Sequence, residues 1–384
     1  MINRDLYRSY KQYKKQLEIG YKKISLWQKM ILSVLFFALM PLAILQYCCH
    51  FRKNRTSTKL TVFPFGQKEP MNIIINELQK IDGVHIIVFP KGLPIFPTQL
   101  IKDFLKTVYE HPLWVMRNMD FWGALSLRCS QYYGYKLKYG IDKLMLFQEY
   151  SFYSSYLTYL FESERGSLYN LMHGVPGLEA CCFRFTKCFV WSEYFKDFYC
   201  KNGAKKDQFI ISGSIYHAYL VKNTKKNKET YDYDIVYALQ GDTHCPQHMI
   251  KYMFNVLERI VKEKGWKIVV RPHPIYQTHV RIPPLLEVIE ESSILMLSNT
   301  KMLVSHFTSM FLDAKILNKK VLAYVPKELL PVVGYLDDNE IVVTKDLLYK
   351  KILENFADTA LICTNPIISI QDESEIRKVI QREI

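Results

Sequence analysis

The sequence lacks the short motifs that mark several common classes of enzyme and nucleic-acid-binding protein. Its 384 residues contain neither a Walker loop nor a G-x-G-x-x-G fingerprint, which argues against P-loop ATPases and dinucleotide-dependent dehydrogenases. It has no zinc-finger spacing and no aromatic-plus-basic RNA motif, so we expect no nucleic acid among the partners. Internal repeats and low-complexity tracts are absent as well. The remaining composition, with 49% hydrophobic and 23% charged residues, is that of a globular protein.

The cysteines show no pattern of disulfide bonds or metal binding. The nine cysteines are odd in number, irregularly spaced and without a C-x-x-C pair, which indicates reduced thiols in a cytosolic compartment. His244, Cys245 and His248 lie close in sequence, but no fourth ligand is evident. We therefore expect no metal and no cofactor.

Positive charge is abundant. The net charge of +14 implies an anionic partner, and nucleic acid, anionic lipid headgroups and anionic small molecules are the candidates. Much of the excess lies in residues 1–29 and 222–228. The first of these regions precedes Met30–Cys49, which contains no charged residue and as a helix is about 30 Å long, the thickness of a bilayer core.

The apolar segment leaves three alternatives open: a helix that spans a membrane, a helix that lies in its interface, or a buried helix of the globular domain. No small-residue cleavage site follows it, which argues against a signal peptide. Basic residues flank both ends, so orientation is not decided, but they suit an anionic cytoplasmic leaflet. We interpret residues 1–55 as a basic arm and a hydrophobic helix that associates with a membrane.

The rest of the chain alternates short apolar runs with helical periodicity, which predicts an α/β fold with parallel sheets. A polar, charged stretch divides the alternation into two halves and is typical of a linker. The sequence thus predicts two Rossmann-like domains that face a ligand-binding cleft. The expected parts are residues 56–221, a linker at 222–233, and residues 234–384. The expected strands are Leu60–Phe65, Val84–Phe89, Lys143–Phe147, Leu168–Met172, Cys188–Trp191, Gln208–Ile211, Asp234–Leu239, Lys267–Val270, Met302–Val304, Lys320–Val325 and Glu340–Val343.

The most informative motif is Arg271-Pro272-His273-Pro274, which directly follows the apolar run 266–270. The prolines end the strand and hold the two charged residues at its carboxyl end, where α/β sheets bind ligands. A guanidinium beside an imidazole suits a phosphate, because arginine offers a planar fork of donors. The alternative is a surface turn with an incidental basic pair.

Other polar residues follow strands of the second half. Ser305, Thr308 and Ser309 precede a predicted helix, where their hydroxyls either cap the helix or bind a phosphate at its amino terminus. Gly241 follows another strand and permits either close approach of a ligand or a plain tight turn.

Two candidates for a catalytic base follow strands of the first half. His173 stands before Gly174, and histidine is the side chain that most often serves as a general base, although a lone histidine is more often structural. Glu149 is the second candidate, since a carboxylate at a strand end can deprotonate a hydroxyl or simply favour a helix start.

Taken together, these motifs resemble the GT-B glycosyltransferases of bacterial surface polysaccharides, over roughly residues 143–325. The nearest groups are CDP-glycerol glycerophosphotransferases and capsular sialyl- and Kdo-transferases. The motifs that carry the resemblance are Leu171-Met172-His173-Gly174-Val175-Pro176, Phe189-Val190-Trp191-Ser192-Glu193, Ile211-Ser212-Gly213-Ser214, Arg271-Pro272-His273-Pro274 and Val304-Ser305-His306-Phe307-Thr308-Ser309.

The resemblance implies that Arg271, His273 and the Ser/Thr cluster hold the phosphates of a nucleotide donor. It implies a catalytic role for His173 through the glycerophosphotransferases and for Glu149 through the sialyltransferases. His306-Phe307 stands where the glycerophosphotransferases usually have Asp-Tyr, which favours a sugar nucleotide over a glycerophosphate donor.

The sequence therefore predicts an inverting, metal-independent glycosyltransferase at the cytoplasmic face of a bacterial inner membrane. It would transfer a CMP- or UDP-linked sugar to a surface polysaccharide or lipooligosaccharide acceptor. The alternatives are a CDP-alcohol phosphotransferase and a non-catalytic, membrane-bound scaffold of the same shape.

Overall fold

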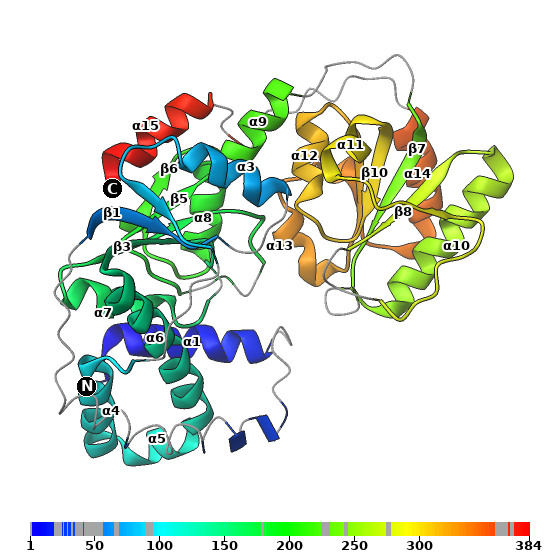
Figure 1. Cartoon of the computed structure of the whole chain (residues 1–384). Helices are drawn as coiled ribbons and strands as arrows, with labels where there is room; N and C mark the ends of the chain where they lie inside the picture. The colour runs from blue at the N-terminus through cyan, green and yellow to red at the C-terminus, as the bar shows by residue number, and fades with distance from the viewer. Residues whose placement is uncertain are drawn as a thin grey trace. The chain divides into compact units, whose positions relative to one another are not determined.

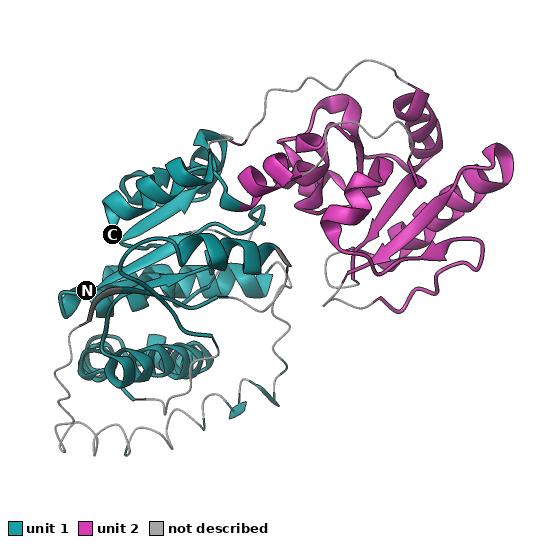
Figure 2. Ribbon diagram, turned by 45° about the horizontal axis from the view of Figure 1, so that its top comes forward, with its two compact units in different colours: residues 1–215, 371–384 teal, residues 216–370 magenta. Residues whose placement is uncertain are grey.

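The structure, a computed structural model, describes residues 2–18, 57–64, 69–88, 95–149, 151–177, 180, 182–223, 231–241, 245–273, 278–357 and 372–384, with 25, 27–28, 30–31, 34, 41 and 368 as isolated positions. The chain forms two compact units (Figure 2). Unit 1 consists of Met1–Ile215 and Gln371–Ile384, and unit 2 of Tyr216–Ile370.

Unit 1 is built on a six-stranded parallel sheet of order β2-β1-β3-β4-β5-β6 (Figure 1). Its strands are β1 (Ser57–Val62), β2 (Val84–Ile86), β3 (Ile141–Leu146), β4 (Ser167–Leu171), β5 (Lys187–Val190) and β6 (Phe209–Ile211). Its helices are α1 (Arg4–Glu18), α3 (Glu69–Leu78), α4 (Thr98–Glu110), α5 (Pro112–Arg117), α6 (Met119–Tyr139), α7 (Ser154–Ser163), α8 (Glu193–Lys201) and α15 (Glu373–Glu383), with a 3-10 turn at Lys206–Gln208.

Unit 2 has a second six-stranded parallel sheet, of order β12-β11-β10-β7-β8-β9. Counted from β7 this is the strand order of a Rossmann fold. Its strands are β7 (Tyr233–Leu239), β8 (Ile268–Pro272), β9 (Glu287–Val288), β10 (Thr300–Ser305), β11 (Lys320–Tyr324) and β12 (Ile341–Val342). Its helices are α9 (Ile215–Asn223), α10 (Gln247–Lys264), α11 (Ser293–Ser298), α12 (Met310–Ile316), α13 (Leu330–Val333) and α14 (Lys345–Ala357), with 3-10 turns at Lys327–Leu329 and Asp338–Glu340.

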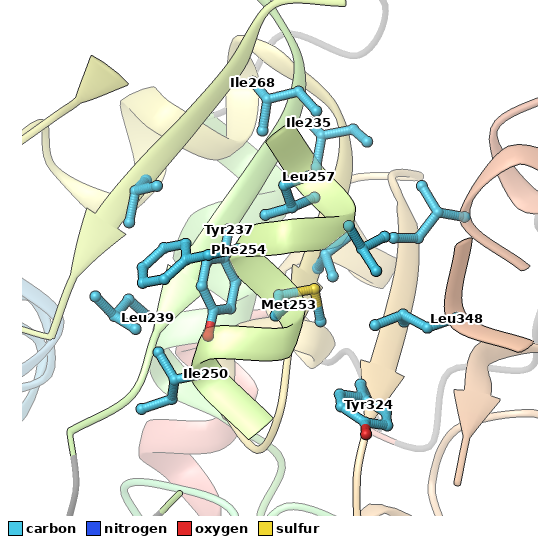
Figure 3. Close-up of a cluster of buried hydrophobic side chains, with 14 of the residues drawn as sticks. Ile235, Tyr237, Leu239, Ile250, Met253, Phe254, Leu257, Ile268, Tyr324 and Leu348 are labelled. Atoms are coloured by element: carbon cyan, nitrogen blue, oxygen red, sulfur yellow. The ribbon is translucent and has the colours of Figure 1, made fainter. Parts of the chain in front are cut away.

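Helix α10 shows how the core of unit 2 forms. Its apolar side chains recur every three or four residues, so Ile250, Phe254 and Leu257 share one buried face over the sheet (Figure 3). The ring of Phe254 meets that of Tyr237 on β7 edge to face, with centroids 5.5 Å apart. The helix ends at Gly265, which has a φ of +68°. Residues with a side chain rarely adopt this left-handed conformation.

Helix α1 differs from the basic arm expected at the amino terminus. The helix buries Leu6, Ser9, Tyr13 and its two glutamines, and packs on α7. The hydroxyl of Tyr13 donates to Asp120 at 3.0 Å, and Ser9 Oγ accepts the backbone N–H at the start of α7 at 3.1 Å. The physical reason is spacing: Arg4 and the three lysines of residues 4–18 lie on the outer face of a helix whose inner face is buried.

The apolar segment Met30–Cys49 lies almost entirely outside the described residues. In the part of the chain that the structure describes, no helix has the length and apolar character needed to cross a membrane. The expected linker at 222–233 overlaps residues 224–230, which are also outside the described part.

The carboxyl-terminal helix differs from the expected domain of residues 234–384. Helix α15 packs against α3 in unit 1, where it buries Ile376 and Ile380. An ion pair between Arg377 and Glu77 adds to this contact. Unit 1 is therefore assembled from both ends of the described chain.

Candidate functional site

The polar cluster of unit 2 lies beside β7, where the order of strand addition in the sheet reverses. Strand β7 pairs with β8 on one side and with β10 on the other, and such a switch point is where Rossmann folds bind ligands. Ala238 of β7 pairs with both Arg271 and Ser305, so the carboxyl ends of all three strands align. The structure thus brings together the three predicted elements of the donor site.

Arg271 connects β8 to the start of α12. Strand β8 extends through Arg271 and Pro272, two residues further than predicted. The guanidinium is partly exposed; its Nε donates to the Glu291 carbonyl at 3.2 Å, and Nη1 lies 3.8 Å from the sulfur of Met310. The cation of β8 is therefore held next to the loop that follows β10.

The three hydroxyls of that loop have different surroundings. Ser305 is buried and donates to the Ala238 carbonyl at 2.6 Å, so it ties β10 to β7. Thr308 accepts the backbone N–H of Met310 at 3.2 Å. Ser309 is exposed at the N-cap position without a side-chain cap bond. Because α12 is only seven residues long, its dipole is small, and Arg271 supplies a full positive charge beside this loop.

Two further predicted residues frame the same edge. Gly241 is buried just after β7, and its carbonyl accepts the N–H of Cys245 at 3.2 Å. His273 is partly exposed and directly follows β8. Pro274 and His244 lie outside the described residues. Within the described ranges, no three His, Cys, Asp or Glu side chains gather as a possible metal site.

His306 lies beneath this edge as a structural residue. Its Nδ1 lies 2.8 Å from the backbone carbonyl of Tyr324, which can only accept, so Nδ1 carries the proton. Its Nε2 lies 2.8 Å from the hydroxyl of Tyr237 and accepts a hydrogen bond from that hydroxyl. Burial lowers the pKa of His306 to about 4, so the ring is neutral near pH 7.

In unit 1 the structure brings the two predicted base candidates together. Glu149 follows β3 and His173 follows β4, and these strands are neighbours. Oε2 of Glu149 lies 3.5 Å from Nδ1 of His173. The imidazole is 20% exposed, whereas the carboxylate is 0% exposed. Only the histidine can therefore touch a substrate at this edge.

A buried amide holds the carboxylate in place. Asn170, the residue of β4 that pairs with Leu146, donates from Nδ2 to Oε2 of Glu149 at 3.3 Å. Its Oδ1 accepts the backbone N–H of Gln148 at 2.8 Å. The other oxygen of Glu149 is buried and makes no hydrogen bond within the described structure. A buried oxygen without a hydrogen bond is costly, and a catalytic role is one reason for a protein to keep it.

Sequence reasoning missed this amide and one buried pair of unit 2. Asn170 could have been noticed as a polar residue within the apolar run 168–172, which predicts a buried hydrogen-bonding role. His217 of α9 and Asp313 of α12 form a buried pair, with Nε2 and Oδ1 2.8 Å apart. No local pattern joins these two residues, which lie far apart in the sequence.

Two Rossmann-like units in one chain define the GT-B type of fold, and comparison with solved structures agrees. UDP-GlcNAc 2-epimerase from Methanocaldococcus jannaschii, in complex with UDP-GlcNAc and UDP, matches with a TM-score of 0.58 and 13% identity over 84% of this chain and 99% of that one. The enzyme of the same name from Neisseria meningitidis, bound to UDP-GlcNAc, has a TM-score of 0.54 and 14% identity, over 84% of this chain and 98% of its own.

A glycosyltransferase has a similar fold. A spinosyn rhamnosyltransferase complexed with thymidine diphosphate matches with a TM-score of 0.50 and 10% identity, over 85% of this chain and 96% of its own. No protein-family model matches the sequence, and no curated protein is significantly similar to it. The identities are low, so these comparisons establish the fold and leave the reaction to the site itself.

Proposed function

We propose that the protein is a glycosyltransferase that moves a sugar from a CMP- or UDP-linked donor to a hydroxyl of a surface polysaccharide or lipooligosaccharide. The observation that carries this proposal is the pair formed by His173 and Glu149. A partly exposed imidazole backed by a buried carboxylate is a general base for a hydroxyl. The structural neighbours that bind UDP-GlcNAc or thymidine diphosphate support a nucleotide-activated substrate.

Each side chain of the pair has a distinct task. The carboxylate of Glu149 faces Nδ1 and favours the tautomer in which this nitrogen carries the proton. Nε2 of His173 is then the unprotonated ring nitrogen, and it takes the proton of the acceptor hydroxyl. The acceptor oxygen forms a bond to the anomeric carbon from the face opposite the nucleotide. The bond from that carbon to the phosphate oxygen breaks, and its electron pair stays on the phosphate, so the configuration inverts.

Unit 2 supplies the groups that bind the donor. Arg271 and His273 neutralise the charge that develops on the departing phosphate, which is the task of any oxyanion stabiliser. Thr308 and Ser309 donate hydrogen bonds to the same phosphates, and Gly241 lets the backbone approach the nucleotide. Because Arg271 supplies the positive charge, we propose that the reaction needs no metal ion.

Binding of nucleotides tests the donor site directly. Thermal-shift measurements with CMP, CDP, UDP and GDP should show a rise in melting temperature with CMP or UDP, since a ligand of the native state stabilises it. Arg271→Gln should weaken this binding about tenfold or more. The matched control is Arg259→Gln, which removes an exposed arginine of α10 and should bind as wild type. If none of the four nucleotides raises the melting temperature, a non-catalytic scaffold becomes the better description.

Product analysis tests the reaction. Mass spectrometry of the product should show a glycosidic bond. A phosphodiester would indicate transfer from a CDP-alcohol instead. The second candidate is a nucleotide-sugar 2-epimerase, favoured by the two epimerase structures that this fold resembles. That reaction would return an epimerised nucleotide sugar without consuming any acceptor.

Substitutions in unit 1 test the assignment of the base. His173→Ala should abolish most activity and leave nucleotide binding unchanged, since the donor rests on unit 2. Glu149→Gln should be milder, because it removes the orienting charge and keeps the imidazole. The matched control is His85→Ala, at an exposed histidine of β2. An inactive Glu149→Gln together with an active His173→Ala would give the role of base to the carboxylate.

A further inference from the structure

Helices α4 and α5 of unit 1 pack against each other, and side chains at the amino-terminal end of the chain and on α1 contact both. The side chain of Asn3, just before α1, donates to Asp103 of α4 at 3.4 Å. Further along α1, the ring of Tyr10 lies 5.0 Å from that of Trp114 on α5. Lys14 Nζ lies 6.0 Å from the Tyr10 ring, so the cationic side of α1 borders α5 directly.

Large apolar side chains are exposed on the surface of these helices. Leu105 is 57% exposed and Tyr109 90% exposed; they lie four residues apart on one side of α4. Leu113 is 66% exposed and Met116 71% exposed, and they lie three residues apart on α5. Exposed apolar side chains that gather in this way mark an interaction surface, whereas single ones do not.

The same three helices also carry exposed basic side chains. The exposed cations of the three helices are Arg4, Lys11, Lys14, Lys15, Lys102, Lys106 and Arg117, and their exposed acids are Glu18 and Glu110. Glu110 lies 3.8 Å from Lys106, which offsets part of its charge. The exposed residues of the three helices thus combine large apolar side chains with an excess of positive charge.

We propose that this surface docks on an anionic lipid bilayer. Leucine, methionine and tyrosine side chains enter the interface between headgroups and acyl chains, while lysine and arginine remain at the level of the phosphates. The charge is complementary to anionic headgroups, which attract each basic residue near the surface. The inference goes beyond the proposed function: it adds to the membrane association that residues 1–55 predict, and it places a contact with the membrane in the folded unit, separate from residues 30–49.

Co-sedimentation of the full chain with vesicles tests the inference. The protein should bind vesicles of phosphatidylglycerol and phosphatidylcholine more tightly than vesicles of phosphatidylcholine alone. The double substitution Leu113→Asp with Met116→Asp should lower this binding about tenfold or more. The matched control is Leu295→Asp with Leu347→Asp, two leucines of unit 2 that are 52% and 49% exposed. The control should bind as wild type.

The contribution of the basic side chains is tested in the same assay. Lys14→Gln with Lys106→Gln should weaken binding to the anionic vesicles about tenfold, whereas Lys262→Gln with Lys264→Gln on α10 should have little effect. Unchanged binding of both α1/α4/α5 variants would overturn the inference. So would tighter binding to an oligonucleotide than to anionic vesicles through the same residues.

The outcome is separable from that of the proposed function. All substituted side chains are exposed, so circular dichroism and the melting temperature should match wild type. The thermal shift with nucleotides should also be unchanged. Failure of vesicle binding therefore leaves the proposed transfer reaction intact, and failure of nucleotide binding leaves the surface intact.

Discussion

The buried imidazole of His306 should make the stability of unit 2 depend on pH. The folded ring has a pKa of about 4, lowered by burial, and an unfolded histidine titrates near 6.5. In acid the unfolded chain therefore takes up the proton first. The stabilisation is complete above pH 6.5 and is lost as the pH falls towards 4. The loss reaches about 2 kcal/mol at pH 5 and about 3 kcal/mol below both pKa values.

Urea denaturation of wild type and His306→Asn at about pH 7.5 and about pH 5 measures this contribution. Asparagine keeps a donor for the Tyr324 carbonyl but does not titrate, so the variant should lose about 2 kcal/mol less than wild type on acidification. Carboxylates titrate equally in both proteins and cancel in the comparison. The exposed residue change His248→Asn should follow the wild-type slope. Equal slopes for wild type and His306→Asn would refute the argument.

Four other outcomes follow from the contacts. In urea titrations, Tyr13→Phe should lower the free energy of unfolding by about 2 kcal/mol, because it removes a hydrogen bond to Asp120. The control Lys11→Ala, on the outer face of α1, should change that free energy by less than about 0.5 kcal/mol. Asn170→Ala should cost about 2 kcal/mol in the same titration, because it removes the hydrogen bonds to the Glu149 carboxylate and to the Gln148 backbone N–H. The same variant should lower kcat and leave KM nearly unchanged. Arg271→Lys should weaken nucleotide binding in thermal-shift titrations, because a lysine lacks the planar fork. Dialysis against a chelator should leave the transfer rate unchanged.

The regular elements of both sheets could be predicted because their signals are local. The apolar periodicity of residues 247–264 predicts helix α10 with its observed bounds, since Pro246 precedes the apolar stripe and Gly265 follows it. Apart from the two-residue edge strand β9, which was not predicted, the strands of both sheets occur where apolar runs predicted them, within a few residues at each end. Helix α6 was not predicted, because aromatic and small residues on several sides hide its periodicity. Helix α15 was not predicted either, and its place in unit 1 depends on contacts with α3 that no local pattern encodes.

In the candidate site, likewise, single residues could be predicted from local patterns, whereas the contacts between them could not. Strand ends drew attention to Glu149, His173 and Arg271, because parallel sheets collect polar residues at their carboxyl edges. The contact between Glu149 and His173 depends on β3 and β4 being neighbours, and strand order is a property of the whole sheet. The exposed fraction that separates the base from its orienting carboxylate likewise comes only from packing.

The return of α15 to unit 1 sets an order for folding during synthesis. The ribosome delivers all of Tyr216–Ile370 before the helix that covers α3 has been made. Unit 2 is uninterrupted in sequence and can close on itself as soon as it emerges, and domains that emerge complete fold as units. Unit 1 is translated first, but the surface of α3 that later covers Ile376 and Ile380 stays exposed until α15 has been made. A chain truncated at residue 370 should therefore have a protease-resistant second half and a first half in which the contact face of α3 stays uncovered.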